Sequence, residues 1–156
     1  MNVIDAPSGA LKALRRRAAG SLQRTFATPL KRLPAFVGAI LGESAPIRGA
    51  SAFVESIVFE PKHLRNLLEA NGLPKSYGVE WTIAAKGREE SAALLESLLA
   101  DWLDFYFAPE PKHILLYADH DEYATLFASK KGPLSRAADR LKAIGVREIT
   151  DYARAI

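Results

Sequence analysis

The chain has 156 residues, of which 49% are hydrophobic and 25% are charged. This composition is typical of a soluble globular domain and argues against a disordered chain. There is no cysteine, which excludes disulfide frameworks, thiolate nucleophiles and thiolate metal sites. The longest apolar run, residues 35–41, is shorter than the roughly 20 residues that span a bilayer, so no transmembrane segment is predicted.

The net charge of +3 is unevenly distributed along the chain. Residues 1–48 hold eight Lys or Arg and two acidic residues, a net charge of +6, and the remaining 13 basic and 16 acidic residues give 49–156 a net charge of −3. This asymmetry predicts a basic arm, 1–48, attached to a mildly acidic domain, 49–156. Such an arm can contact nucleic acid, anionic lipid or an acidic protein surface, or it can dock on its own domain.

The arm is predicted to be helical. Five apolar residues at spacings of three and four form one helical stripe, namely Leu11, Leu14, Ala18, Leu22 and Phe26. Pro34 and Gly42 mark the start and end of a second short helix. The basic side chains predicted to bind a partner are Lys12, Arg15, Arg16, Arg17, Arg24, Lys31 and Arg32. An Arg-rich amphipathic N-terminus is also typical of transit peptides, so the expected location is the cytoplasm, or an organellar matrix in a eukaryotic source.

From residue 51 onward the pattern alternates between strands and helices. A strand is predicted over 52–60 and a helix over 61–70, which Asn71 and Gly72 end. Clean alternation predicts another strand over 77–85. The following helix has a continuous apolar stripe made of Leu94, Leu95, Leu98, Leu99, Trp102, Leu103 and Tyr106.

The C-terminal third continues the same alternation. Two strands are predicted over 113–118 and 122–129, then a helix between Gly132 and Gly145, and a last strand over 146–153. From residue 77 the order is therefore β, α, β, β, α, β. This order predicts an α+β fold of the ferredoxin-like, split βαβ type, an antiparallel sheet with helices on one face, extended by the preceding βα unit and the arm. Because that fold hosts many activities, it does not define the function.

An acidic tetrapeptide, Asp119, His120, Asp121 and Glu122, joins the two predicted strands. Carboxylate and imidazole groups are metal ligands, but adjacent side chains in a tight turn point in different directions and cannot all converge on one ion. Asp also favours turn conformations. The tetrapeptide is therefore predicted to be the tip of a β-hairpin, and it is retained as a candidate acidic binding surface.

No motif in the chain indicates a reaction. The sequence has no Gly-x-Ser-x-Gly elbow, no phosphate-binding glycine loop and no His-Glu-x-x-His zinc motif, so no cofactor or metal is predicted and catalysis is not supported. The expected function is non-catalytic binding through protein–protein contacts, as a regulatory, inhibitor or scaffold subunit. The alternatives are nucleic-acid binding through the arm and a metal-dependent enzyme with its site at 119–122. Self-association is left open.

Overall fold

The computed structural model describes residues 1–5, 7–42, 46–74 and 81–156. The helices are α1 (Ala10–Ala19), α2 (Leu33–Leu41), α3 (Lys62–Ala70), α4 (Gly87–Ala100) and α5 (Lys131–Ala143), with a 3-10 turn η1 (Leu30–Arg32) before α2. The strands are β1 (Asn2–Asp5), β2 (Leu22–Ala27), β3 (Gly49–Ser56), β4 (Trp81–Lys86), β5 (Asp104–Glu110), β6 (Leu115–Ala118), β7 (Tyr123–Ala128) and β8 (Glu148–Ile149).

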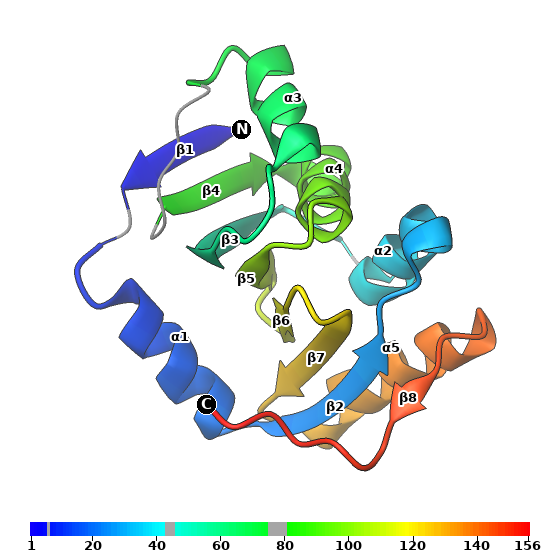
Figure 1. Cartoon of the computed structure of the whole chain (residues 1–156). Helices are drawn as coiled ribbons and strands as arrows, with labels where there is room; N and C mark the ends of the chain where they lie inside the picture. Colours follow the sequence, from blue (N-terminus) through cyan, green and yellow to red (C-terminus); the bar gives the residue numbers. More distant parts are fainter. Residues whose placement is uncertain (6, 43–45, 75–80) are drawn as a thin grey trace.

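The described strands form one sheet in the order β1-β4-β3-β5-β6-β7-β2-β8 (Figure 1). Every neighbouring pair is antiparallel. The N-terminal strand β1 lies at one edge, whereas β2 lies near the opposite edge between β7 and β8. The fold is therefore α+β with an antiparallel sheet, as the sequence predicted.

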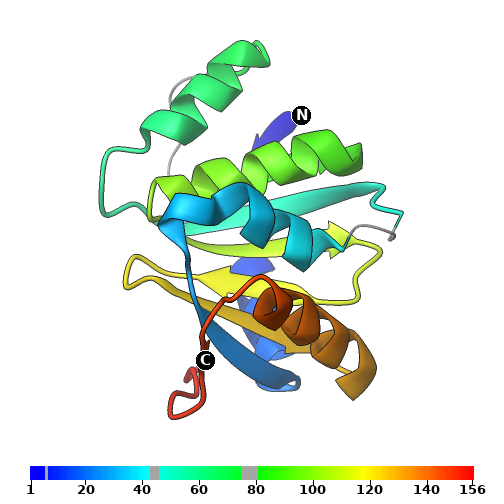
Figure 2. The ribbon, with the colours of Figure 1, turned by 90° about the vertical axis from the view of Figure 1, so that its right-hand side faces the viewer.

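The main hydrophobic core lies between the sheet and helices α2, α3, α4 and α5, which cover one face (Figure 2). Successive residues of a strand point to opposite faces, so Phe105 and Phe107 of β5 point to this core and are fully buried. From the helix side, Leu94 and Leu98 of α4 are also fully buried. This face is closed almost entirely by aliphatic and aromatic side chains.

Helix α1 covers the opposite face of the sheet (Figure 1). Its buried residue Ala18, with partly buried Leu11 and Leu14, packs against a second and smaller apolar cluster. The strands contribute to that cluster Phe53, Tyr106, Ala108, Leu115, Tyr117 and Phe127. The prediction that helices cover one face holds for four of the five described helices, and α1 is the exception.

The prediction that the helical stripe continues through Leu22 and Phe26 is wrong, because these residues belong to β2. Helix α1 ends at Ala19, and the N–H of the following Gly20 donates to the carbonyl oxygen of Arg16 at 3.2 Å. Leu22, Arg24 and Phe26 also have the two-residue spacing that places side chains on one face of a strand. Pairing with β7 on one side and β8 on the other supplies hydrogen-bond partners for the backbone N–H and C=O groups of β2. Residues 1–48 thus supply two strands to the same sheet as 49–156.

The helical stripe predicted through Tyr106 is also shorter in the structure. Helix α4 ends at Ala100, and Leu103 and Tyr106 lie in or beside strand β5. Leu103 and Tyr106 are buried in this strand arrangement as they would be on a helix, so their apolar character fitted both interpretations. The sequence contained a competing signal, because Phe105 and Phe107 alternate with Tyr106.

The ferredoxin-like order is not confirmed. From Trp81 the elements are β4, α4, β5, β6, β7, α5 and β8, one strand more than the split βαβ arrangement. The structure has a βα unit before them, β3 and α3, with β3 between β4 and β5, but the strand is Gly49–Ser56 where 52–60 was predicted. Of the predicted strand 77–85, residues 77–80 lie outside the described residues, and the predicted strand 146–153 is reduced to Glu148–Ile149. Among the described helices, none has the length and apolar character needed to cross a bilayer.

Candidate functional site

Four of the seven basic residues predicted to bind a partner are engaged inside the molecule. Arg15 forms an ion pair with Glu55 of β3, and Arg24 forms a bidentate pair with Glu148 at 2.6 Å for both hydrogen bonds. The other two donate to backbone carbonyl groups: Arg17 to Lys112 and Ile114 at 3.3 and 3.0 Å, and Arg32 to Ile144 at 2.6 Å. Burial lowers the pKa of Arg17. These four side chains hold the N-terminal segment on the rest of the chain.

The other three, Lys12, Arg16 and Lys31, are exposed. Within the described part of the chain, their side chains form no hydrogen bond or ion pair. Lys12 and Arg16 project from α1, whereas Lys31 lies in η1 on the opposite face of the sheet. The structure therefore does not bring the seven predicted residues together in one surface.

The acidic tetrapeptide is the tip of the hairpin between β6 and β7, as predicted. Asp119 is nearly buried, forms an ion pair with Arg154, and accepts the N–H groups of Asp121 and Tyr123, both at 3.1 Å. His120 instead turns to Asp104, whose carboxylate lies 2.8 Å from Nδ1 and raises the pKa of the imidazole.

The other two members of the tetrapeptide are Asp121, whose carboxylate lies 3.9 Å from Nε2 of His120, and Glu122. Asp121 is 75% exposed, and Glu122 has a left-handed backbone, with φ of 65°, and accepts the N–H of Thr28. Among the described residues no three His, Cys, Asp or Glu side chains are grouped as metal ligands would be. The geometry of the hairpin is accounted for by its own turn and by Arg154.

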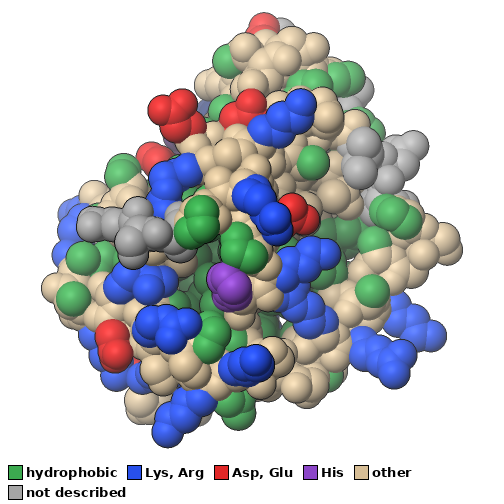
Figure 3. Space-filling view, turned by 180° about the vertical axis from the view of Figure 1, so that it is seen from behind, with side chains coloured by type: hydrophobic (Ala, Val, Ile, Leu, Met, Phe, Trp, Pro, Cys, Tyr) green, Lys and Arg blue, Asp and Glu red, His purple; other side chains and the backbone are tan. Residues whose placement is uncertain are grey.

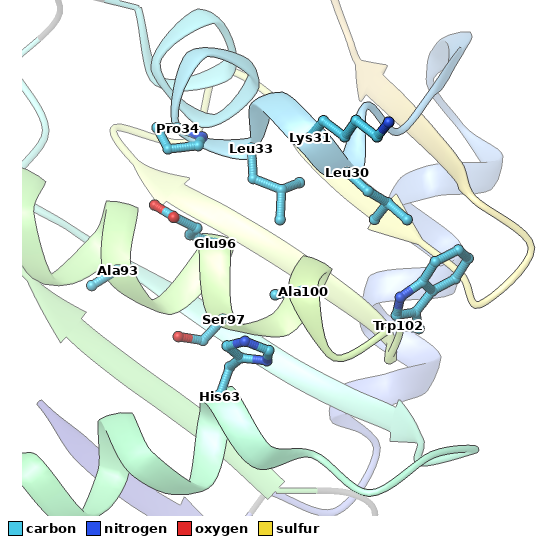
Figure 4. Close-up of a pocket in the computed structure, with 10 residues that line it drawn as sticks. All are labelled: Leu30, Lys31, Leu33, Pro34, His63, Ala93, Glu96, Ser97, Ala100 and Trp102. Carbon is cyan, nitrogen blue, oxygen red and sulfur yellow. The ribbon is translucent and has the colours of Figure 1, made fainter.

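A cleft with a volume of about 610 Å³ lies on the helix face. It runs between η1 and the start of α2 on one side and α3 and α4 on the other, and Figure 4 shows the side chains that line it. Leu30 and Trp102 lie next to each other at one end of the cleft, and His63 and Ser97 lie along its lower side. The lining residues are Leu30, Lys31, Leu33, Pro34, His63, Ala93, Glu96, Ser97, Ala100 and Trp102.

His63 and Ser97 face the same cleft, and His63 is paired with a nearly buried carboxylate. Asp101 lies 2.7 Å from Nδ1 of His63 and also accepts the backbone N–H groups of His63 and Leu64 at 3.0 and 2.7 Å. The carboxylate therefore caps the first turn of α3 from the end of α4, a structural role. No hydrogen bond joins Ser97 to His63, both of which the structure describes, so the three residues are not connected as a catalytic triad would be.

Trp102 has an unusual backbone conformation. Helices α3, α4 and α5 all end in the same hydrogen-bonded motif, in which the residue after the cap adopts a left-handed conformation. Gly72 and Gly145 take this position after α3 and α5, with φ of 68° and 78°, but after α4 it is Trp102, with φ of 56°. A residue with a side chain loses about 1 to 2 kcal/mol there relative to glycine, and Trp102 nevertheless keeps its ring partly exposed in the cleft.

A polar network occupies the opposite face of the sheet, beside α1. Tyr117 donates to Glu55 at 2.8 Å, and the Arg154 guanidinium lies 4.4 Å from the centre of the Tyr117 ring. Burial and the Glu55 carboxylate raise the pKa of Tyr117 far above its usual value. The two cations of this network, Arg15 and Arg154, each have a carboxylate partner, so the network is neutral and attaches α1 and the C-terminal segment to the sheet.

Comparison of the chain with models of protein families, with curated proteins and with solved structures found no match. The candidate site is therefore defined by its geometry alone. The prediction from sequence missed Trp102 as a site residue because it was assigned to a helical stripe. The only signal was the lack of Gly or Asn at the point where α4 ends.

Proposed function

We propose that the chain is a non-catalytic binding protein that recognises a segment of a partner protein in the cleft between α2, α3 and α4. The observation that carries this proposal is Trp102, which keeps a left-handed backbone at the end of α4 and presents its ring in the cleft. Backbone strain of this kind persists where the surrounding structure imposes it, and it is often found at functional sites. Tryptophan is also enriched among the residues that dominate binding energy at protein interfaces.

The lining of the cleft fits a peptide segment with an apolar anchor. Its walls are formed by Leu33, Pro34 and Ala100, and the exposed Leu30 lies beside Trp102. The charges at its rim have opposite signs, Lys31 on η1 and Glu96 on α4. An apolar centre with a charged rim is the usual anatomy of a protein interface, and a segment with one basic and one acidic residue flanking an apolar side chain would match it.

The decisive variant is Trp102→Gly, because it separates binding from folding. Glycine takes the same position after α3 and α5, so the substitution relieves the backbone while removing the ring. The expected result is a free energy of unfolding within about 1 kcal/mol of the wild-type value. Binding of the partner protein is expected to be lost. The measurement is quantitative affinity capture from the native host, followed by titration of the captured protein against purified wild type and variant.

Lys12→Glu on α1 is the matched control, because Lys12 is exposed and lies on the opposite face. Lys31→Glu should weaken binding of the same partner, whereas Lys12→Glu should leave it unchanged. If the partner binds Trp102→Gly as tightly as the wild type, the cleft is not its binding site. Retained binding to Lys31→Glu together with loss in Lys12→Glu would move the interface to α1.

Nucleic-acid binding is the second candidate, and the exposed side chains of Lys12, Arg16 and Lys31 support it. The test has to use the whole chain, because a truncation to 49–156 would remove β1 and β2 from the sheet. Binding through these residues predicts that replacing all three by alanine abolishes association with generic duplex or single-stranded nucleic acid, and that wild-type binding weakens steeply as salt rises. Equal binding of the triple variant and the wild type would exclude this role for them.

A further inference from the structure

A second cleft, of about 200 Å³, lies at the other end of α2. It is bounded by the end of α2, the first turns of α5 and the loop between β5 and β6. Figure 2 shows that these segments lie at the same end of the molecule, and Figure 3 views the molecule from that end. Lys and Arg side chains gather there around small apolar patches (Figure 3). The lining residues are Ile40, Leu41, Ile47, Pro109, Pro111, His113, Ile114, Pro133, Arg136 and Arg140.

The charged groups of this cleft all have the same sign. Arg136 and Arg140 are four residues apart on α5 and therefore lie on one side of the helix. The pKa of Arg140 is lowered, first by burial and second by the positive charge of Arg136. The two guanidinium charges therefore repel each other. Among the residues that the structure describes, no carboxylate lines the cleft.

Arg140 is held in place by the end of α2. Its Nε donates to the carbonyl oxygen of Ala39 at 2.7 Å and its Nη2 to that of Ile40 at 3.5 Å. Because a guanidinium group has five N–H donors, these two bonds leave others for a ligand in the cleft. The backbone carbonyl groups at the C-terminal end of α2 thus fix the orientation of the guanidinium group without neutralising its charge.

Arg136, in contrast, is exposed, and its side chain has no hydrogen-bonded or ion-paired partner in the described part of the chain. Arg15, Arg24 and Arg154 have the carboxylate partners Glu55, Glu148 and Asp119. Arg136 and Arg140 have none among the described residues, and they line the same cleft. A bound anion would relieve the repulsion between the two guanidinium groups and use their free donors.

The remaining walls of the cleft are apolar and rigid. Three prolines, Pro109, Pro111 and Pro133, line it, and proline has no N–H to donate. Ile47 and Ile114 add aliphatic surface. Polar recognition is thus concentrated at the arginine side, with His113 as the other polar side chain of the lining. This division suits a small ligand with one charged and one apolar end.

We infer that this cleft binds a small organic oxyanion, a carboxylate or phosphate joined to a compact apolar group. The oxyanion lies between Arg136 and Arg140, whose planar guanidinium groups match the geometry of such anions. The apolar group contacts Pro111, Pro133 and Ile47. This site is separate from the protein-binding cleft, which involves the opposite end of α2.

The test titrates the full-length chain with benzoate, phenyl phosphate, inorganic phosphate and the neutral benzyl alcohol. Binding is followed by calorimetry and by NMR of the arginine Nε–Hε groups. At least one of the two aromatic anions is expected to bind and to shift the signals of Arg136 and Arg140, whereas benzyl alcohol does not. The tighter of benzoate and phenyl phosphate identifies the oxyanion. Inorganic phosphate that binds as tightly as phenyl phosphate would contradict the apolar half of the proposal.

Arg136→Gln is the critical variant, because Arg136 is exposed and its loss leaves no buried partner. Removal of one charge-assisted contact is expected to weaken aromatic-anion binding at least about tenfold, while Arg16→Gln, an exposed arginine on α1, leaves it unchanged. Equal binding of wild type and Arg136→Gln, or no binding of either aromatic anion, would overturn the proposal. Trp102→Gly should not change anion binding, so this result and the protein-partner result can fail independently.

Discussion

The two faces of the sheet are covered in different ways. Helices α2 to α5 close one face over a large and almost wholly apolar core, in which Leu98, Phe105 and Phe107 are fully buried. On the other face, α1 and the C-terminal segment cover a smaller apolar cluster and are fixed by the charged and aromatic groups around Tyr117. Apolar burial gives the larger and less directional contribution to stability. The first face should therefore determine global stability, and the second should open locally at lower free energy.

The largest effect is expected from Leu98→Ala in α4. Leu98 is fully buried in the main core, and its truncation should lower the free energy of unfolding by about 3 kcal/mol through lost burial and a residual cavity. Leu14→Ala, at a partly exposed position of α1, should cost about 1 kcal/mol or less, since less apolar area leaves contact. Denaturant unfolding measures both. If both variants lose the same free energy of unfolding, the two faces contribute equally to global stability, which would contradict the comparison.

A smaller effect is expected from Arg154→Met on the second face. The substitution leaves Asp119, which is 10% exposed, without its cation and removes the guanidinium from the face of Tyr117. The expected loss is about 2 kcal/mol. Hydrogen exchange should accelerate in α1 and in residues 150–156 and remain unchanged in α4. Arg147→Met is the control, because Arg147 is exposed. If hydrogen exchange in Arg154→Met accelerates equally on both faces, the second face does not open separately.

The smallest effect concerns Glu148, a charged group at the edge of the first face. Its hydrogen bonds from Arg24, followed by those from Lys142, lower its pKa from 4.5 to about 2. Because the folded state has the lower pKa, the pair contributes fully above pH 4.5, and the contribution is lost as the pH falls through about 2. Glu148→Gln should lower the free energy of unfolding by about 1 to 2 kcal/mol at neutral pH. It should also weaken the dependence of that free energy on pH in the acid limb, below pH 4.5. An unchanged limb would show that this pair contributes little to the first face.

Local patterns identified most of the elements but missed the strands β1, β2 and β5. The hairpin tip at 119–122, the βα unit and the helix ended by Gly145 were predicted from turn residues and periodicity, which act within a few residues. Strand β2 was missed because Leu22 and Phe26 fit both a helical and a strand period. Strand β5 was missed because Leu103 and Tyr106 continued the stripe of α4. In both cases distant strands satisfied the backbone, which no local pattern encodes.

The candidate sites were less accessible to prediction than the fold. The sequence shows the excess of positive charge in residues 1–48, but it does not show that Arg15, Arg17, Arg24 and Arg32 bind groups more than 35 residues away in the chain. Trp102 and the pair of Arg136 and Arg140 line clefts whose walls come from three or more elements. A cleft of this kind has no sequence signature of its own.

The sequence alone determined the α+β class, the absence of thiol chemistry and the position of the acidic hairpin, because composition and short-range turn chemistry are local properties. Tertiary structure alone decided which arginines have a carboxylate partner and which two line a cleft without one. It also placed Trp102 at the end of a cleft and not within a helix. These outcomes depend on the distances between side chains that are far apart in the chain, and such distances are set only when the strands pair and the helices pack on the sheet.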